Sequence, residues 1–318
     1  MNWDEKYRAT TLDEICNQTI IINALKKISE NKNIPHLIFY GPPGSGKTST
    51  IHALTKQIFD NEYENRIIEL NASNERGINI IREKIKSSAK QSININIKYP
   101  NWKFIILDDA DTLTQDAQFA LRRIIEQFSK ITRFCLICNQ INKIIEPIKS
   151  RCALFHFKSI SNENIKEKLL FILKNENISN YSENIIQKII NYSNNDLRKA
   201  INMLNYIYNN KNNNENESLI VLNNIIGIEP NINTFLNDVF NHQINNVNNY
   251  IKTFFINGYS FINQILYIHN WIMNINIDDE LKIKINNMLI NVEQNMSKGG
   301  DEYIQIMKLA YYIMQLIE

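Results

Sequence analysis

The sequence predicts an α/β fold, a parallel sheet with flanking helices, followed by a part that is entirely helical. Over residues 1–157, short apolar runs alternate with helical patterns, which is typical of a parallel sheet covered on both faces. From Ser161 onward the strand pattern is weak, and apolar residues recur at spacings of three and four. An asparagine-rich stretch, Asn209–Asn214, divides this helical part and is expected to be a loop between domains.

The first part carries five strand-like runs, which are separated by helical patterns. The strands are expected at His36–Tyr40, Ile67–Leu70, Phe104–Leu107, Phe134–Cys138 and Leu154–Phe157. Helices are expected between them at Thr48–Phe59, Ile78–Ala89 and Ala117–Phe128.

The second part is expected to contain only helices. Gly258 and Gly299–Gly300 are expected to separate helices within Ser218–Glu318. Three shorter helices are expected before the asparagine-rich loop, at Glu163–Asn175, Ser182–Tyr192 and Leu197–Tyr208.

Length and charge limit what the chain can be. Its 318 residues exceed the ~250–300 at which single cores stop growing, so two or three domains are expected. A net charge of only +2 does not indicate bulk attraction to nucleic acid, so any DNA contact must come from locally placed basic residues. The polar start Met1–Lys6 and the lack of any apolar stretch near the ~18 residues of a membrane span predict a soluble intracellular protein.

Two of the four cysteines, Cys135 and Cys138, have a CxxC spacing that suggests zinc. No second CxxC or Cys/His pair stands at ligand spacing, and the pair lies in an apolar run. Buried strand positions are therefore favoured over a metal site. With Cys16 and Cys152 they do not indicate a disulfide framework in a chain this long.

A phosphate-binding loop is predicted at Gly41–Thr48, which matches G-x₄-G-K-S/T in every fixed place. A strand-like run precedes the loop and a helical run follows it, as the motif requires. Glycines let the backbone N–H groups face phosphate oxygens, and the following helix adds its positive end. Lys47 is expected to reach the β- and γ-phosphates of ATP, and the Thr48 hydroxyl to ligate Mg²⁺.

A second sequence element is the apolar run Phe104–Leu107, which is expected to be a buried strand and is followed by an acid. Asp108 at its tip is expected to hold Mg²⁺, and Asp109 stands where a hydrolysing enzyme needs a carboxylate to polarise water. Asp111 is as well explained by a helix cap or a surface position as by a site. Taken alone, Asn139 fits a turn better than a site, and a lone Arg151 fits a surface charge.

Further strings along the chain match the pattern of a known family. They are Trp3–Arg8 (WDEKYR, like the opening WxEKYRP), Pro35–Thr50, Glu69–Ile78, Ala120–Arg123, Thr132–Asn139, Ile144–Pro147, Ser150–Cys152 and Asp196–Ala200. Together these motifs, which span residues 3–200, resemble the small subunits of replication factor C, a clamp loader of the AAA+ class. The C-terminal run Gly300–Gln305 continues the likeness, most like the vertebrate subunit numbered four.

The resemblance implies an architecture and partners. Residues 1–158 form the AAA+ nucleotide-binding domain, 159–215 a helical lid and 216–318 a helical collar that joins the chain to other replication factor C subunits in a hetero-pentamer. The implied partners are the sliding clamp, PCNA, and primer–template DNA, with no membrane. The implied location is the nucleus, which rests on the resemblance alone.

The resemblance also assigns roles. Asn139 matches a first sensor of the γ-phosphate, and Arg198 a second sensor carried on the lid. Arg151 matches an arginine finger that acts on ATP bound to the neighbouring subunit. Tyr7 and Arg8 match residues near the adenine pocket. The implied nucleotide contacts of the loop are Gly41, Pro42, Pro43, Gly44, Ser45, Gly46, Lys47, Thr48 and Ser49.

Contacts with DNA and clamp are implied as well. Arg76, Arg82 and Lys143 match residues that follow the phosphate backbone of duplex DNA in the ring. Without the family, each is better explained as a solvated surface charge. The stretch Ser88–Pro100 lies where the family meets the clamp, although an edge strand or plain loop fits it nearly as well.

Departures from the family bear on activity. Asp109 replaces the usual glutamate and is one methylene shorter; a base displaced by ~1 Å can cost on the order of 10²-fold in rate. Two hypotheses follow, an ATP-hydrolysing subunit and a subunit that only binds ATP. Ala9 replaces a proline, and Asn74 a frequent aspartate. A branch-migration helicase or a small-molecule kinase explains fewer of the motifs.

Overall fold

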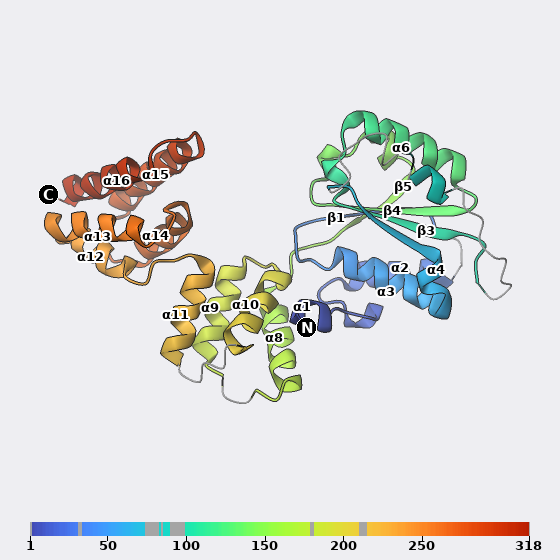
Figure 1. Cartoon of the computed structure of the whole chain (residues 1–318), viewed down its shortest axis with the longest axis horizontal. Coiled ribbons are helices and arrows are strands. Elements are labelled where there is room, and N and C mark those ends of the chain that lie inside the picture. The colour runs from blue at the N-terminus through green and yellow to red at the C-terminus, as the bar shows by residue number, and fades with distance from the viewer. Residues whose placement is uncertain are drawn as a thin grey trace. The chain divides into compact units, whose positions relative to one another are not determined.

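The computed structural model describes residues 2–30, 34–73, 83, 85–89, 99–178, 181–209 and 215–317. The chain divides into two compact units, Met1–Asn205 and Tyr206–Glu318 (Figure 1). The finer division into three domains, with boundaries near 158 and 215, stays a prediction.

The first unit is built on a parallel five-stranded sheet in the order β2-β3-β4-β1-β5. Its strands are β1 His36–Tyr40, β2 Ile67–Asn71, β3 Lys103–Asp108, β4 Thr132–Cys138 and β5 Cys152–His156. All neighbours pair in parallel, so the carboxyl ends of the strands share one edge. The predicted α/β fold class is confirmed, with each predicted strand lying within two residues of its observed place.

Helices cover both faces of this sheet (Figure 1). Alternate strand residues point to opposite faces, and the buried residues form two separate cores. The first core joins Phe104 and Ile106 to helices α2 (Thr19–Glu30) and α3 (Lys47–Phe59). The second core joins Ile105 and Leu107 of β3 to helix α6 (Gln115–Phe128). Burial on both faces explains why β3 and β4 are near-continuous apolar runs.

The CxxC pair lies in β4, as predicted. Cys135 packs in the core beside α2 and α3, whereas Cys138 packs in the core beside α6. A spacing of three along a strand sends two side chains to opposite faces. The two thiols therefore do not converge on one ion, and burial raises the pKa of the Cys138 thiol to about 12.

Shorter helices and a three-helix group complete the first unit. The predicted helices before the asparagine-rich loop are confirmed as α8, α9 and α10, whereas only the end of the predicted helix Ile78–Ala89 lies within the described residues. The bounds are α1 Trp3–Lys6, η1 Leu12–Glu14, η2 Asp60–Glu62, α4 Tyr63–Arg66, η3 Ala110–Thr112, η4 Ile141–Lys143, α7 Glu146–Lys149, α8 Asn162–Asn175, α9 Glu183–Ser193 and α10 Leu197–Asn209.

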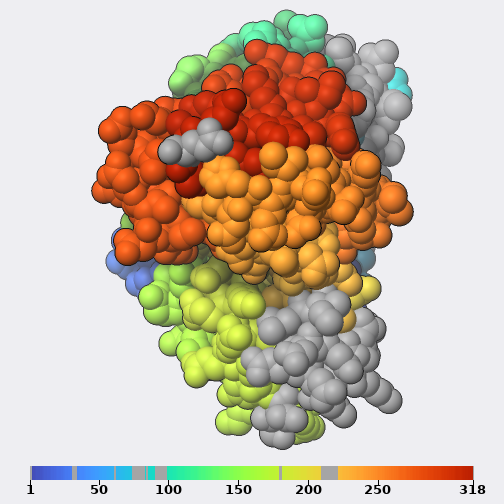
Figure 2. Space-filling model, turned by 90° about the vertical axis from the view of Figure 1, so that its left-hand side faces the viewer, coloured from blue at the N-terminus to red at the C-terminus, as the bar shows by residue number. Residues whose placement is uncertain are grey.

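The second unit is helical throughout its described residues, as predicted. Figure 2 shows its later helices, in orange to red, packed against one another. Gly258 and Gly299 fall between helices and have positive φ angles of 75° and 89°, which glycine adopts readily. Nowhere in the described chain is a helix both long and apolar enough to span a membrane. The bounds are α11 Glu215–Ile226, α12 Ile232–Phe240, α13 Ile244–Ile256, α14 Ile262–Asn274, α15 Asp279–Ser297 and α16 Glu302–Ile317.

A histidine at the start of β1 makes the stability of the sheet sensitive to acid. His36 Nδ1 accepts a hydrogen bond from the backbone N–H of Phe134 at 3.2 Å, which requires a neutral ring. Burial, and then the nearby charge of Arg133, lower the pKa of His36 to about 4. The unfolded residue takes up a proton near its ordinary pKa of about 6.5. The contribution is therefore present above pH 6.5 and is lost as the pH falls toward 4.

We expect the free energy of unfolding to fall by about 3 kcal/mol between pH 7 and pH 4 on account of His36. His36→Asn keeps an acceptor near Nδ1 but does not titrate, so its unfolding free energy should change less over this range. Urea unfolding at both pH values measures the difference. His242→Asn, at an exposed position, is the control and should retain the full pH dependence; equal slopes for both variants would contradict the assignment.

A candidate nucleotide-binding site

The predicted phosphate loop connects β1 to α3 and depends on its glycines. Gly41, Gly44 and Gly46 have φ angles of 149°, 66° and 91°. A Cβ at Gly41 would lie 2.2 Å from the Phe157 carbonyl oxygen, and one at Gly44 2.0 Å from Asp196 Oδ1. Gly46 caps α3, whose first backbone N–H groups lack partners within the helix. The loop thus presents free N–H donors and a positive helix end, which suit phosphate.

Lys47 is held inside this loop and is only 7% exposed. Its ammonium group donates hydrogen bonds to the carbonyls of Gly41 and Pro42, both at 2.8 Å, and to Asn139 Oδ1 at 3.0 Å. Burial lowers the pKa of Lys47, and the charge of Asp108 opposes that shift. The lysine therefore joins the loop after β1 to the residue that follows β4.

The first turn of α3 meets the end of β3 through the Thr48 hydroxyl and the Asp108 carboxylate. Thr48 Oγ1 donates to Asp108 Oδ2 at 3.1 Å, and the other oxygen, Oδ1, accepts the N–H of Asp109 at 2.9 Å. Hard oxygen donors of this kind are the protein ligands that Mg²⁺ takes beside substrate phosphates. The donor set accordingly fits Mg²⁺ held together with a nucleotide.

Asp109 follows in a left-handed backbone conformation, with φ 52° and ψ 38°. Aspartate is among the few non-glycine residues that adopt this conformation routinely. Burial raises the pKa of Asp109, and the negative charges of Asp108 and Asp111 raise it further. A hydrogen bond with the Asn71 side chain, from the end of β2, acts in the opposite direction.

Asp111 fixes the end of β4. Its Oδ2 accepts the backbone N–H groups of Asn139 and Gln140 at 3.2 and 3.1 Å. Of the alternatives that the sequence leaves open for Asp111, the geometry favours a part in positioning the site. Because β4 lies between β1 and β3 in the sheet, Asn139 is placed between the phosphate loop and the acidic pair.

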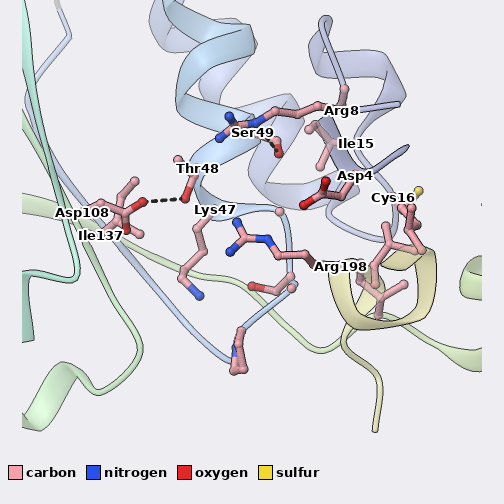
Figure 3. Close-up of a pocket in the computed structure, with 18 of the residues that line it drawn as sticks. Asp4, Arg8, Ile15, Cys16, Lys47, Thr48, Ser49, Asp108, Ile137 and Arg198 are labelled. Carbon is pink, nitrogen blue, oxygen red and sulfur yellow. Dashed lines mark hydrogen bonds between the residues drawn. The ribbon is translucent and has the colours of Figure 1, made fainter. Parts of the chain in front are cut away.

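Lys47, Thr48, Asp108, Asp109 and Asn139 line a cavity of about 480 Å³, within the usual range for small-molecule sites (Figure 3). Figure 3 shows Lys47, Thr48 and Asp108 on one side of the cavity, and Ile15 and Cys16 on the other. The predicted residues that line it are Tyr7, Arg8, Pro43, Gly44, Ser45, Gly46, Lys47, Thr48, Ser49, Asp108, Asp109, Asn139 and Arg198. Gly41 and Pro42 take part through their carbonyls, which accept from Lys47.

Sequence reasoning missed one end of this cavity. Most of its residues come from the N-terminal segment and from the helical group after the sheet, and three come from strands β2 and β4, so no local spacing signals them. They include apolar, acidic, polar and basic side chains. The lining residues without a predicted role are Asp4, Glu5, Ala9, Glu14, Ile15, Cys16, Asn71, Ile137, Cys138, Ile160, Lys168, Leu197 and Ile201.

The N-terminal segment is fixed between the lining helices and the loop. Tyr7 donates its hydroxyl proton to Glu176 at 2.7 Å, and Lys6 forms an ion pair with the same carboxylate at 2.5 Å. Arg8 Nε donates to Ser49 Oγ at 3.4 Å. Contacts with Glu176 beyond α8 and with Ser49 on α3 hold this segment over the cavity.

Other predicted site residues lie elsewhere. Arg151 is exposed, pairs with Glu126 at 2.7 Å and donates to the Pro147 carbonyl at 2.7 Å. It is not among the described residues that line the cavity. Lys143 lines a separate, open groove beside α6. The predicted DNA contacts Arg76 and Arg82, and most of the predicted clamp-contact stretch, lie outside the described residues.

Comparison with known proteins gives near full-length relatives. Replication factor C subunit 2 of Saccharomyces cerevisiae is 37% identical over 99% of this chain and 93% of its own length. Human replication factor C subunit 4 is 37% identical over 98% and 88%. The replication factor C small subunit of Sulfurisphaera tokodaii is 37% identical over 98% and 95%. The chain belongs to the replication factor C small subunits.

Family profiles agree with this membership. The replication factor C C-terminal domain matches residues 229–311, the RCF1/5-like AAA+ ATPase lid domain residues 167–208, and the DNA polymerase III delta subunit residues 17–161. A solved RuvB of Thermotoga maritima shares the fold, with a TM-score of 0.53 and 17% identity over 70% of this chain and 74% of its own. This replication factor C subunit thus has an AAA+ ATPase fold with a nucleotide-binding site.

The close approach of Gly44 to Asp196 predicts a sensitive position. We expect Gly44→Ala to lower ATP affinity by about tenfold or more, because the left-handed φ costs ~1–2 kcal/mol and the new methyl displaces the start of α10. Calorimetric titration with ATP measures this. Gly258→Ala is the control, since it has φ +75° and nothing within 4 Å of its Cβ. Unchanged ATP affinity in Gly44→Ala would show that the loop tolerates the displacement.

Proposed function

We propose that this chain is a subunit of a hetero-pentameric clamp loader that uses ATP and Mg²⁺ to load the ring-shaped clamp PCNA onto primer–template DNA. The observation that carries the proposal is a pair of hydrogen bonds. One joins Lys47 to Asn139, and the other joins Thr48 to Asp108. These two contacts join the loop, the acidic strand and the sensor position into one site. The full-length identity to replication factor C subunits supplies the context.

Each group at the site has a proposed task. Lys47 and the loop N–H groups bind the phosphates, and Thr48 and Asp108 would hold Mg²⁺. When bound, that ion would neutralise charge on the phosphate oxygens. Asn139 Oδ1 accepts from Lys47, so its amide N–H groups remain as donors for the γ-phosphate or the attacking water. Arg198, from α10, would report on the phosphates to the helices that carry it.

Arg151 is proposed to act on the neighbouring subunit's ATP. Its position outside the described lining of its own cavity supports action in trans. Within its own chain, the Arg151 guanidinium forms an ion pair with Glu126. An arginine supplied in trans stabilises charge in the transition state and can raise the rate by ~10³–10⁵. Hydrolysis would then depend on ring assembly.

Action on PCNA and DNA also implies a nuclear location.

A second candidate function is an ATP-binding subunit with little hydrolysis of its own. Asp109 favours it, because its carboxylate is a methylene shorter than glutamate and is bonded to Asn71. The left-handed backbone at Asp109 also disfavours a longer side chain by ~1 kcal/mol or more. Binding and hydrolysis are therefore separate questions for this site.

ATPase measurements on the reconstituted ring separate the two functions. We expect Asp109→Asn to lower the clamp- and DNA-stimulated rate at this site by about 10²-fold if Asp109 is the base, since the amide cannot accept a proton. Asp109→Glu should raise the rate if reach limits it. Equal rates for wild type and Asp109→Asn would identify a binding-only subunit. Lys47→Ala gives the baseline without this site's nucleotide.

DNA contact is proposed for Arg76, Arg82 and Lys143. Lys143 is exposed on the loop after β4, where its charge is available to a phosphate. We expect Lys143→Ala and Arg76→Ala each to reduce the slope of log affinity against log salt by about one unit for the assembled ring. Lys298→Ala, an exposed charge in the second unit, should leave the slope unchanged. A Lys143→Ala slope equal to wild type would remove this residue from the interface.

A further inference from the structure

The carboxylate of Glu126, near the end of α6, is shared by two arginines. Its Oε1 atom accepts a hydrogen bond from Arg122 Nε at 3.1 Å, one helical turn away, and lies 2.7 Å from Nη2 of Arg151, which follows α7. The hydrogen bond from Arg122 is the main cause that lowers the pKa of Glu126, so the carboxylate is ionised at neutral pH. Arg122 thus holds the carboxylate, and the carboxylate holds Arg151.

A second set of contacts fixes the plane of the Arg151 guanidinium. Its Nη1 atom donates to the Pro147 carbonyl at 2.7 Å and to Ser150 Oγ at 3.3 Å. Pro147 belongs to α7, and Ser150 caps the end of that helix. Since the guanidinium is planar and rigid, contacts at both Nη1 and Nη2 determine its orientation. Helices α6 and α7 together therefore set the direction in which Arg151 points.

These contacts leave part of the guanidinium available. An arginine carries five N–H donors; Pro147 and Ser150 take those of Nη1, and Glu126 takes one of Nη2. Within the described part of the chain, Nε and the second N–H of Nη2 make no hydrogen bond. The side chain is 35% exposed, so these two donors can reach a group outside the chain. Arginine commonly binds phosphate through two N–H donors.

We infer that Glu126 is a positioning residue that orients Arg151 toward the phosphates of ATP bound by the neighbouring subunit. The inference rests on the proposed action of Arg151 in trans and adds the group that aims it. A long side chain loses rotamer freedom when it docks on a ligand. Part of that loss occurs already in the folded chain, because Glu126 and Pro147 hold the guanidinium. Glu126 lies outside the described lining of its own chain's cavity, so it acts through Arg151.

The test measures ATP hydrolysis at the neighbouring site in the reconstituted ring. Lys47→Ala in this chain removes hydrolysis at its own site, and the part of the remaining clamp- and DNA-stimulated rate that Arg151→Ala abolishes is the neighbour's share. We expect Glu126→Gln to lower kcat of this share by about fivefold, because an exposed ion pair changes the population of one orientation by about that factor. KM for ATP should stay nearly unchanged. Glu126→Ala, which keeps no acceptor, should lower kcat further.

A combination with Arg151→Ala separates positioning from a general structural effect. In the ring that carries Arg151→Ala, adding Glu126→Gln should have no further effect, whereas an additional loss would assign Glu126 another role. Glu183→Gln removes a comparable exposed carboxylate, which pairs with Lys166, and should keep the full rate. Ring assembly and melting temperature of Glu126→Gln should match wild type, since exposed ion pairs contribute little to stability; a loss of either would indicate a structural residue instead.

The Arg151→Ala ring also separates failure of this inference from failure of the proposed function. If Arg151→Ala lowers the rate and Glu126→Gln does not, the positioning role of Glu126 is wrong and the action of Arg151 in trans stands. A faster rate in Glu126→Gln also overturns the inference, because the carboxylate would then hold the guanidinium away from the neighbour's ATP. If Arg151→Ala itself leaves the rate unchanged, the proposed action in trans is wrong, and the role of Glu126 falls with it.

Discussion

The buried ammonium group of Lys47 is the contact on which the site depends. It donates to two carbonyls of its own loop and to Asn139 across the sheet edge. An ammonium group out of water needs such acceptors, because burial disfavours its charge. These bonds tie the phosphate loop after β1 to the residue that follows β4. The sheet order, with β4 between β1 and β3, makes this geometry possible.

The remaining contacts extend from that centre in two directions. Toward β3, Thr48 and Asp108 meet, and Asp111 fixes the end of β4 from the same turn. Toward the chain's start, Arg8 reaches Ser49 on α3 and Tyr7 bonds to Glu176. The nucleotide cavity is consequently shared by the sheet, the N-terminal segment and α10. A ligand that fills it would therefore contact all three.

The acidic turn shows how local backbone conformation limits chemistry. Asp109 occupies a left-handed conformation that aspartate tolerates better than glutamate. Burial and two neighbouring carboxylates raise its pKa, which makes it a better proton acceptor. Its side chain is one methylene shorter than glutamate and therefore reaches less far toward a water. The same turn therefore carries one feature that favours hydrolysis and one that opposes it.

The sequence by itself determined the fold class, the phosphate loop and the strand-end residue Asp108, because each has a local pattern: an apolar run, a glycine spacing or an acid at a strand tip. Asn139 entered only through the family resemblance, since taken alone it fits a turn. The motifs also identified the family. Only the tertiary structure decided how Asp111 acts and that Asp4 and Ile15 share a cavity with Lys47, since these contacts join segments far apart in the chain. Sequence spacing carries no record of which distant side chains line one cavity, and that grouping is a property of the folded packing alone.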